Sequence, residues 1–216
     1  MELFDDIKVT YDDKSDKDLN RAYFLFKIIS RPFFTKILTS VLQLAIKIRL
    51  PIKGIIKAII YKQFCGGTSI QASQSTIDNL WKSGIGTILN FSAEGKENLE
   101  DFTRTKEEII ATIQKANQLE NIPFAVFKPT AITSFSLLEK ITKKENLNKQ
   151  ELEEKKEFDS RVNEICKIAF ELKVPLFIDA EESWIQGAID EIVMEMMKKF
   201  NGEKTWIFNT IQLYRK

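Results

Sequence analysis

The sequence predicts an α/β fold with a parallel β-sheet, preceded by an all-helical basic segment. From Ile85 onward, short apolar runs alternate with long, charged amphipathic segments, as expected of strands buried on both faces and the helices that connect them. Before that point the apolar residues recur at helical spacing only. Right-handed crossovers between parallel strands lead either to an open, doubly wound sheet or to a closed β/α barrel.

Composition limits the chemistry. The chain has 216 residues, 44% of them hydrophobic, which is enough for one substantial core. Its 32 basic and 31 acidic residues give a net charge of +1, so no whole-molecule affinity for nucleic acid is expected. It has no histidine, which excludes Ser-His-Asp and Cys-His catalysis and any metal site that needs an imidazole. The only cysteines, Cys65 and Cys166, are too few for a disulfide scaffold and suit a reducing cytoplasm.

Residues 1–82 form the expected helical arm. Between Leu19 and Ile77 there are nine Lys and Arg residues and no acidic residue. The acidic amino terminus does not resemble a secretory signal, and the longest apolar stretch, Ile37 to Ile46, is too short to span a membrane. Two interpretations remain open for residues 21–62: a core helix whose lysines extend to solvent, or a surface that contacts an anionic membrane. Helical spacing is carried by Ile37, Val41, Leu44, Ile48, Ile52, Ile55, Ile56 and Ile59.

Residues 83–216 form the expected sheet domain. Its four strand candidates are Ile85–Phe91, Phe124–Phe127, Val174–Ile178 and Thr205–Ile211. The amphipathic helices between them are expected at Glu100–Leu119, Lys149–Leu172 and Trp184–Phe200. No glycine-rich phosphate-binding sequence is present, so nucleotide binding by such a loop is not supported.

Polar residues follow each strand candidate, at the carboxyl ends where parallel α/β folds bind their ligands. One polar residue follows each of the four successive strands, and these residues should lie close together at the carboxyl end of the sheet. They are Asn90, Lys128, Asp179 and Gln212. A lysine directly after a buried strand needs a carboxylate or a ligand anion, and Asp179 is the natural partner of Lys128. The simpler interpretation is a solvated loop, or a helix cap supplied by Asp179 or Ser183.

Several segments resemble the flavin-dependent proline dehydrogenase family. The resemblance covers nearly the whole chain, and its blocks are FIDAEESWIQGAIDEIVMEMMKKFN, TWIFNTIQLYRK, LNFSAEGKEN, FAVFKPTAI and RLPIKGIIKAIIYKQFCGG. It implies a distorted (βα)8 barrel that holds FAD without a covalent bond and oxidises L-proline to pyrroline-5-carboxylate. It also implies a membrane quinone as the final electron acceptor. The expected location is therefore cytoplasmic, with peripheral contact on the inner face of the membrane.

The resemblance also assigns residue roles. Lys128 matches the lysine that reaches the substrate carboxylate, and Asp179 matches the acid after the third strand, so these two are the expected catalytic residues. Gln212 matches a glutamine near the flavin ring, so Gln212 and Lys128 are the expected cofactor-binding residues, and no metal is expected. Asn90 stands where the family pattern has aspartate.

The resemblance covers about four of the eight strands that a complete barrel needs. The arginines that the family places later, over the flavin and around the substrate carboxylate, have no counterpart in these 216 residues. We therefore expect this half-length chain to lack the full substrate clamp. Two other functions stay open: a barrel enzyme with a Schiff base on Lys128 and proton transfer by Asp179 or Glu181, or a non-catalytic membrane-surface or interaction module.

Overall fold

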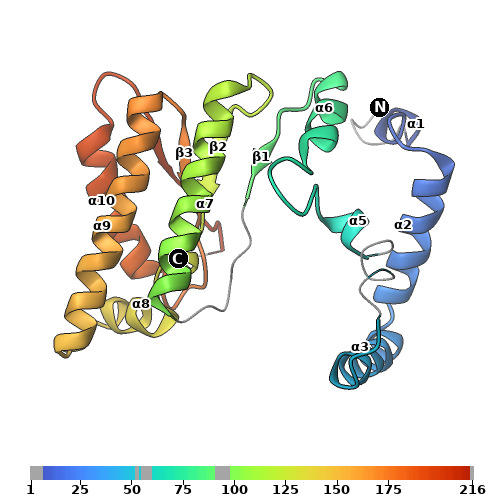
Figure 1. Ribbon diagram of the computed structural model, residues 1–216, viewed down its shortest axis with the longest axis horizontal. Helices are drawn as coiled ribbons and strands as arrows, with labels where there is room; N and C mark the ends of the chain where they lie inside the picture. The colour runs from blue at the N-terminus through green and yellow to red at the C-terminus, as the bar shows by residue number, and fades with distance from the viewer. Residues whose placement is uncertain (1–6, 52–53, 55–59, 91–97, 215–216) are drawn as a thin grey trace. The chain divides into compact units, whose positions relative to one another are not determined.

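The computed structural model describes residues 7–51, 54, 60–90 and 98–214 (Figure 1). The contacts within the chain divide it into two units, Met1–Thr76 and Ile77–Lys216. Helix α6 (Gln74–Lys82) crosses this division. The functional division expected after residue 82 stays a prediction.

The described part of the amino-terminal unit is helical. It contains α1 (Ile7–Thr10), α2 (Asp16–Ile29), α3 (Pro32–Lys47) and α5 (Lys62–Phe64). Ser15 caps α2 by accepting a hydrogen bond from the backbone of Asp18. Pro32 stands at the start of α3, where its missing N–H is not needed. The expected helical spacing is confirmed as far as Lys47, whereas Ile52, Ile55, Ile56 and Ile59 lie outside the described residues.

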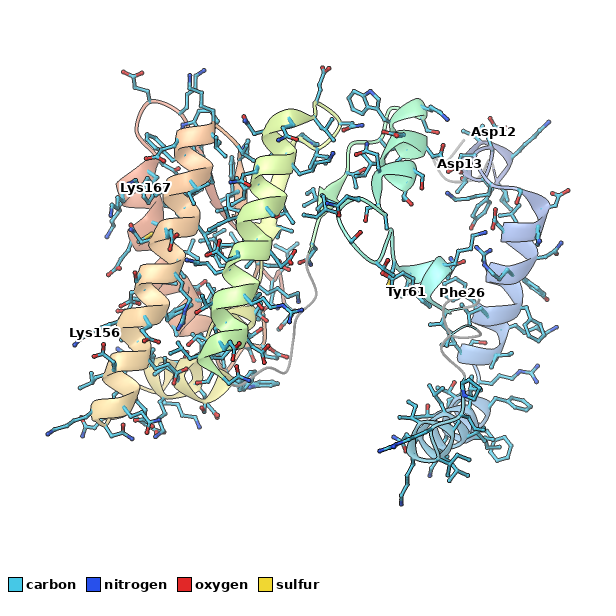
Figure 2. All side chains as sticks on the ribbon, in the orientation of Figure 1. Asp12, Asp13, Phe26, Tyr61, Lys156 and Lys167 are labelled. Atoms are coloured by element: carbon cyan, nitrogen blue, oxygen red, sulfur yellow. The ribbon has the colours of Figure 1, made fainter. Side chains whose placement is uncertain are left out.

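Contacts between α2 and the segment around α5 hold this unit together. Figure 2 labels Phe26 on α2 and Tyr61 just before α5. The ring of Phe26 packs edge-on against that of Phe64, with centroids 6.1 Å apart, and the Tyr61 hydroxyl donates to the carbonyl of Gly67. Asp18 accepts hydrogen bonds from the Ser15 hydroxyl, Lys62 and Arg21, which lower its pKa to about 2.

The carboxyl-terminal unit contains one four-stranded parallel sheet. Its strands are β1 (Ile88–Leu89), β2 (Phe124–Phe127), β3 (Leu176–Ile178) and β4 (Ile207–Asn209), and they lie side by side in the order β1-β2-β3-β4. A doubly wound sheet reverses its strand order at a switch point, whereas a β/α barrel keeps sequential order. The observed order is therefore that of a partial β/α barrel.

All four expected strands are present, and the bounds of β2 agree with the prediction. The others are shorter because apolar runs continue into the loops, beyond the paired residues: β3 begins at Leu176 and β4 ends at Asn209. Phe91, which the first expected strand included, lies outside the described residues.

Helices connect successive strands. They are α7 (Leu99–Gln118), α8 (Phe135–Thr142), α9 (Lys149–Leu172) and α10 (Gln186–Phe200). The predicted bounds of α9 are confirmed. The third helix, expected from Trp184, begins at Gln186 instead, because residues 183–185 form a turn. Helix α8 was not predicted, since its eight residues give too short a pattern of helical period.

The core lies between the sheet and these helices, and Figure 1 shows α7 and α9 running side by side. Ile113 of α7, Ile165 of α9 and Ile189 of α10 are fully buried against the strands. The outer face of α9 is solvated, as Lys156 and Lys167 show at the edge of Figure 2. These lysines pair with Glu153 and Glu171. The solvated charged face is thus part of an ordinary amphipathic helix.

Candidate functional site

Strand side chains alternate between the helix-covered face and the opposite face of the sheet. Ala125 and Phe127 point into the helix-covered core, whereas Phe124 is half-buried on the other face. On that face the rings of Phe124 and Phe177 stack at 4.8 Å, and the rings of Phe177 and Phe208 lie 5.3 Å apart. In a closed β/α barrel this face forms the interior.

Lys128 and Asp179 extend the same face at its carboxyl end. Lys128 follows β2 with an extended backbone (φ −100°, ψ 127°), so it continues the alternation of Phe124. The backbone N–H of Asp179 donates to the carbonyl of Phe127 at 3.0 Å, which extends the β2–β3 ladder. Because Phe127 is paired with Ile178, the next rung places Lys128 beside Asp179. Both side chains are half-buried.

The Asp179 carboxylate accepts a hydrogen bond from the end of β4. Thr210 donates from Oγ1 to Oδ1 of Asp179 at 3.0 Å, and the same Oγ1 accepts from the backbone N–H of Ala180 at 2.5 Å. Thr210 directly follows β4, and no local sequence pattern marks it as a site residue. The ion pair between Lys128 and Asp179 stays a prediction.

Among the described residues, Glu181 is the most buried carboxylate at the carboxyl end of the sheet, with 8% of its surface exposed. One oxygen accepts from the backbone N–H of Thr130 at 2.9 Å and the other from the Thr130 hydroxyl at 2.5 Å. Burial raises the pKa of Glu181, and these hydrogen bonds and the charge of Lys128 oppose the shift. Both oxygens are therefore already hydrogen-bonded, which disfavours the proton-transfer role that the Schiff-base alternative gives to Glu181.

The two other expected site residues lie in contrasting surroundings. Asn90 follows β1 directly and is exposed. Gln212 comes three residues after β4, and its Oε1 is buried without a hydrogen-bond partner among the described residues. Such an orphaned acceptor has to be matched by a donor from elsewhere, because leaving it unpaired is costly.

The helix-cap interpretation of Asp179 and Ser183 is wrong for α10. The residue before that helix is Ile185, and no side chain caps its first turn. Instead, the backbone N–H of Glu181 donates to the Gln186 side chain.

Among the residues that the structure describes, no group of three or more Cys, Asp and Glu could hold a metal ion. Over the same residues, no helix is long and apolar enough to cross a bilayer.

Sequence comparisons match the chain to one family. The profile of the proline dehydrogenase family covers residues 73–216. "Proline dehydrogenase 1, mitochondrial" of Dictyostelium discoideum is 29% identical over 97% of this chain and 43% of its own length. A carbapenem antibiotics biosynthesis protein, CarD of Pectobacterium carotovorum, is 27% identical over 76% of the chain and 44% of its own length. The chain thus spans less than half the length of these relatives.

A solved structure has the same fold over most of the chain. Proline utilization A of Bdellovibrio bacteriovorus, inactivated by N-propargylglycine, superposes with a TM-score of 0.56 at 16% identity. The match covers 74% of this chain and 18% of that protein.

Proposed function

Because the chain belongs to the proline dehydrogenase family, we propose that its four-stranded sheet supplies part of the active site of a flavin-dependent proline dehydrogenase. The reaction oxidises L-proline to pyrroline-5-carboxylate, and a membrane quinone is the final electron acceptor. The observation that carries this proposal is the face at the carboxyl end of the sheet, where Lys128 and Asp179 lie on adjacent strand ends and Thr210, after the next strand, donates to Asp179.

The expected site residues suit different parts of the reaction. The Lys128 ammonium offers a charge-assisted hydrogen bond to the carboxylate of proline. Asp179, whose carboxylate accepts a hydrogen bond from Thr210, would supply a negative charge from the neighbouring strand end. The orphaned Oε1 of Gln212 can accept a hydrogen bond from an N–H at the edge of a flavin, so the residues present fit FAD. When bound, FAD supplies the hydride acceptor.

The four strands of the described residues are half of a barrel. We expect the 216-residue chain, purified alone with FAD, to oxidise proline far more slowly than the Dictyostelium relative. Adding the part of that relative which the chain does not match should increase dye-linked proline oxidation. If flavin does not co-elute with the folded chain under either condition, the proposal is wrong.

Lys128→Met separates substrate binding from cofactor binding. Loss of the cation should weaken proline binding and raise KM, while flavin stays bound. Lys155→Met, on α9, is the matched control and should leave both unchanged. If Lys128→Met releases FAD but keeps the apparent affinity for proline, the role of Lys128 is misassigned.

A second proposal concerns residues 21–62, for which we favour contact with an anionic membrane surface on the cytoplasmic side. Of the sixteen residues of α3, only Ala45 is buried. Large apolar side chains on this helix are exposed, including Phe33 at 72% and Val41 at 57%. An apolar surface of this kind, bordered by Lys36 and Lys47 in an acid-free segment, is typical of interfacial helices.

Vesicle co-sedimentation tests the membrane proposal. Binding to phosphatidylglycerol vesicles should exceed binding to phosphatidylcholine vesicles and should weaken as salt rises. The double variant Lys36→Glu, Lys47→Glu should lose the preference for anionic lipid. The matched control Lys156→Glu, Lys167→Glu changes two exposed lysines of α9 and should keep it. Equal binding to both lipids, or to neither, would favour a core helix.

A further inference from the structure

The turn that follows Lys128 is held by a single carboxylate on the neighbouring strand end. Lys128 precedes a short 3-10 helix, Pro129–Ala131, and Thr130 lies at its centre. Glu181 accepts both the backbone N–H and the hydroxyl of Thr130, at 2.9 and 2.5 Å. Since Thr130 is two residues from Lys128, this contact restrains the backbone from which the lysine side chain starts.

The far end of the same loop is held separately by α9. Glu154 accepts from the Thr133 hydroxyl at 3.1 Å and from the backbone N–H of Ser134 at 3.0 Å. The buried Arg161 donates to the carbonyl of Ile132 at 3.1 Å. The loop therefore has two independent carboxylate anchors, and Glu181 is the one beside Lys128.

Glu181 is itself fixed by α10. Its backbone N–H donates to Oε1 of the fully buried Gln186 at 2.8 Å. The Nε2 of Gln186 donates to Oδ1 of Asp190 at 2.8 Å, and Asn209 of β4 donates to the same oxygen at 3.3 Å. A continuous chain of hydrogen bonds thus links the ends of β2, β3 and β4 through Glu181, and it lets this residue hold Thr130 in one place.

We propose that Glu181 is a positioning residue that orients Lys128 toward the carboxylate of an amino-acid substrate. This inference rests on the proposed function. Glu181 also supplies a negative charge near the Lys128 ammonium, since the two groups interact electrostatically. Removing the Glu181 side chain would remove both effects, whereas an amide at this position would remove only the charge, because its oxygen can still accept from the Thr130 N–H and its nitrogen can donate to the Thr130 hydroxyl.

The first test needs no catalytic activity and uses the full chain. Glu181→Ala, which removes both acceptor oxygens, should speed amide hydrogen exchange at Thr130 at least about tenfold, the change expected from losing one hydrogen bond of about 1.4 kcal/mol. It should also change the rate at which acetic anhydride labels Lys128, measured by mass spectrometry relative to Lys155. The matched control Glu154→Ala removes the carboxylate at the other end of the loop and should leave Lys128 labelling unchanged. Unaltered exchange at Thr130, or equal labelling of Lys128 in both variants, would overturn the proposal.

The second test uses the flavin-loaded protein supplied with the missing barrel part. Glu181→Gln should raise KM for proline about tenfold with kcat nearly unchanged, and Glu154→Gln should change neither. Glu181→Asp, which restores a carboxylate, should recover part of the loss. Equal KM values for the two Gln variants would make Glu181 merely structural. If the unaltered protein does not oxidise proline while Thr130 and Lys128 respond as expected, the enzymatic function fails and the positioning role stands.

Discussion

Thr210 holds Asp179 in place at the carboxyl end of the sheet. Its Oγ1 lies 3.0 Å from Oδ1 of Asp179, to which it donates, and it accepts a hydrogen bond from the backbone N–H of Ala180. One hydroxyl thus donates to a side chain and accepts from the backbone of the neighbouring strand end. It fixes the carboxylate before any ligand arrives, which is the preorganisation that a binding site requires.

Thr210→Val should lower the free energy of unfolding of the carboxyl-terminal unit by about 1 to 3 kcal/mol, because it leaves a carboxylate and a backbone N–H without their partner. Tryptophan fluorescence during urea unfolding measures this, since Trp81, Trp184 and Trp206 all lie in this unit. Thr210→Ser keeps the hydroxyl and serves as the control. Equal stability of the Val and Thr proteins would show that the two hydrogen bonds contribute little.

Ile165→Ala should lower the free energy of unfolding by about 2 to 5 kcal/mol. Ile165 of α9 is fully buried in the core between the sheet and the helices, so its truncation leaves a cavity. The control Lys167→Ala lies on the solvated face of the same helix and should change stability by less than about 0.5 kcal/mol. A similar loss in both variants would argue against this packing of α9.

Cys166 should be inert toward thiol reagents in the folded protein. Its side chain is fully buried, and burial raises its pKa to about 12, so almost no reactive thiolate forms at neutral pH. Cys65 is exposed and should react at once. With Ellman's reagent we expect one thiol per chain before denaturation and two after it. The variant Cys65→Ser should show none until it unfolds, and rapid labelling of that variant would contradict the burial of Cys166.

The sequence was sufficient to predict the order of the strands and of the longer helices between them, because apolar periodicity is a local property. The bounds of α9 and β2 are examples, and α9 begins with a capping box formed by Asn148 and Glu151. Which strands are neighbours depends on contacts between distant residues. The sequence alone therefore left an open sheet and a barrel as alternatives, and the sequential strand order favours the barrel.

The candidate site was predicted less completely for a related reason. Lys128, Asp179 and Gln212 could be proposed as site residues because each follows an apolar run or matches a family motif. The bonds of Thr130, Gln186 and Thr210 depend on the register between strands. Their residue types are common in loops, so no local pattern marks them.

Glu181 should make the folded carboxyl-terminal unit less stable as pH rises. Burial raises its pKa in the folded state, against the charges and hydrogen bonds supplied by Lys128 and Thr130, while Glu182 adds to the increase. Between its unfolded pKa of about 4.3 and this raised value, the folded state binds more protons than the unfolded state. The contribution of Glu181 is thus fully present below about pH 4.3 and is lost as pH rises through the folded pKa.

The measurement is the difference in free energy of unfolding between the unaltered protein and Glu181→Gln, followed from about pH 4 to pH 8 by urea titration. Taking this difference cancels the pH dependence of the groups that both proteins share. These include groups that stabilise the fold as pH rises, such as Glu151, whose pKa is lowered by Lys140 and the backbone of Asn148. The advantage of the unaltered protein over Glu181→Gln should shrink as pH rises and then level off. A pH-independent difference would show that burial does not perturb Glu181, and a difference that grows with pH would mean that the folded state favours its charged form.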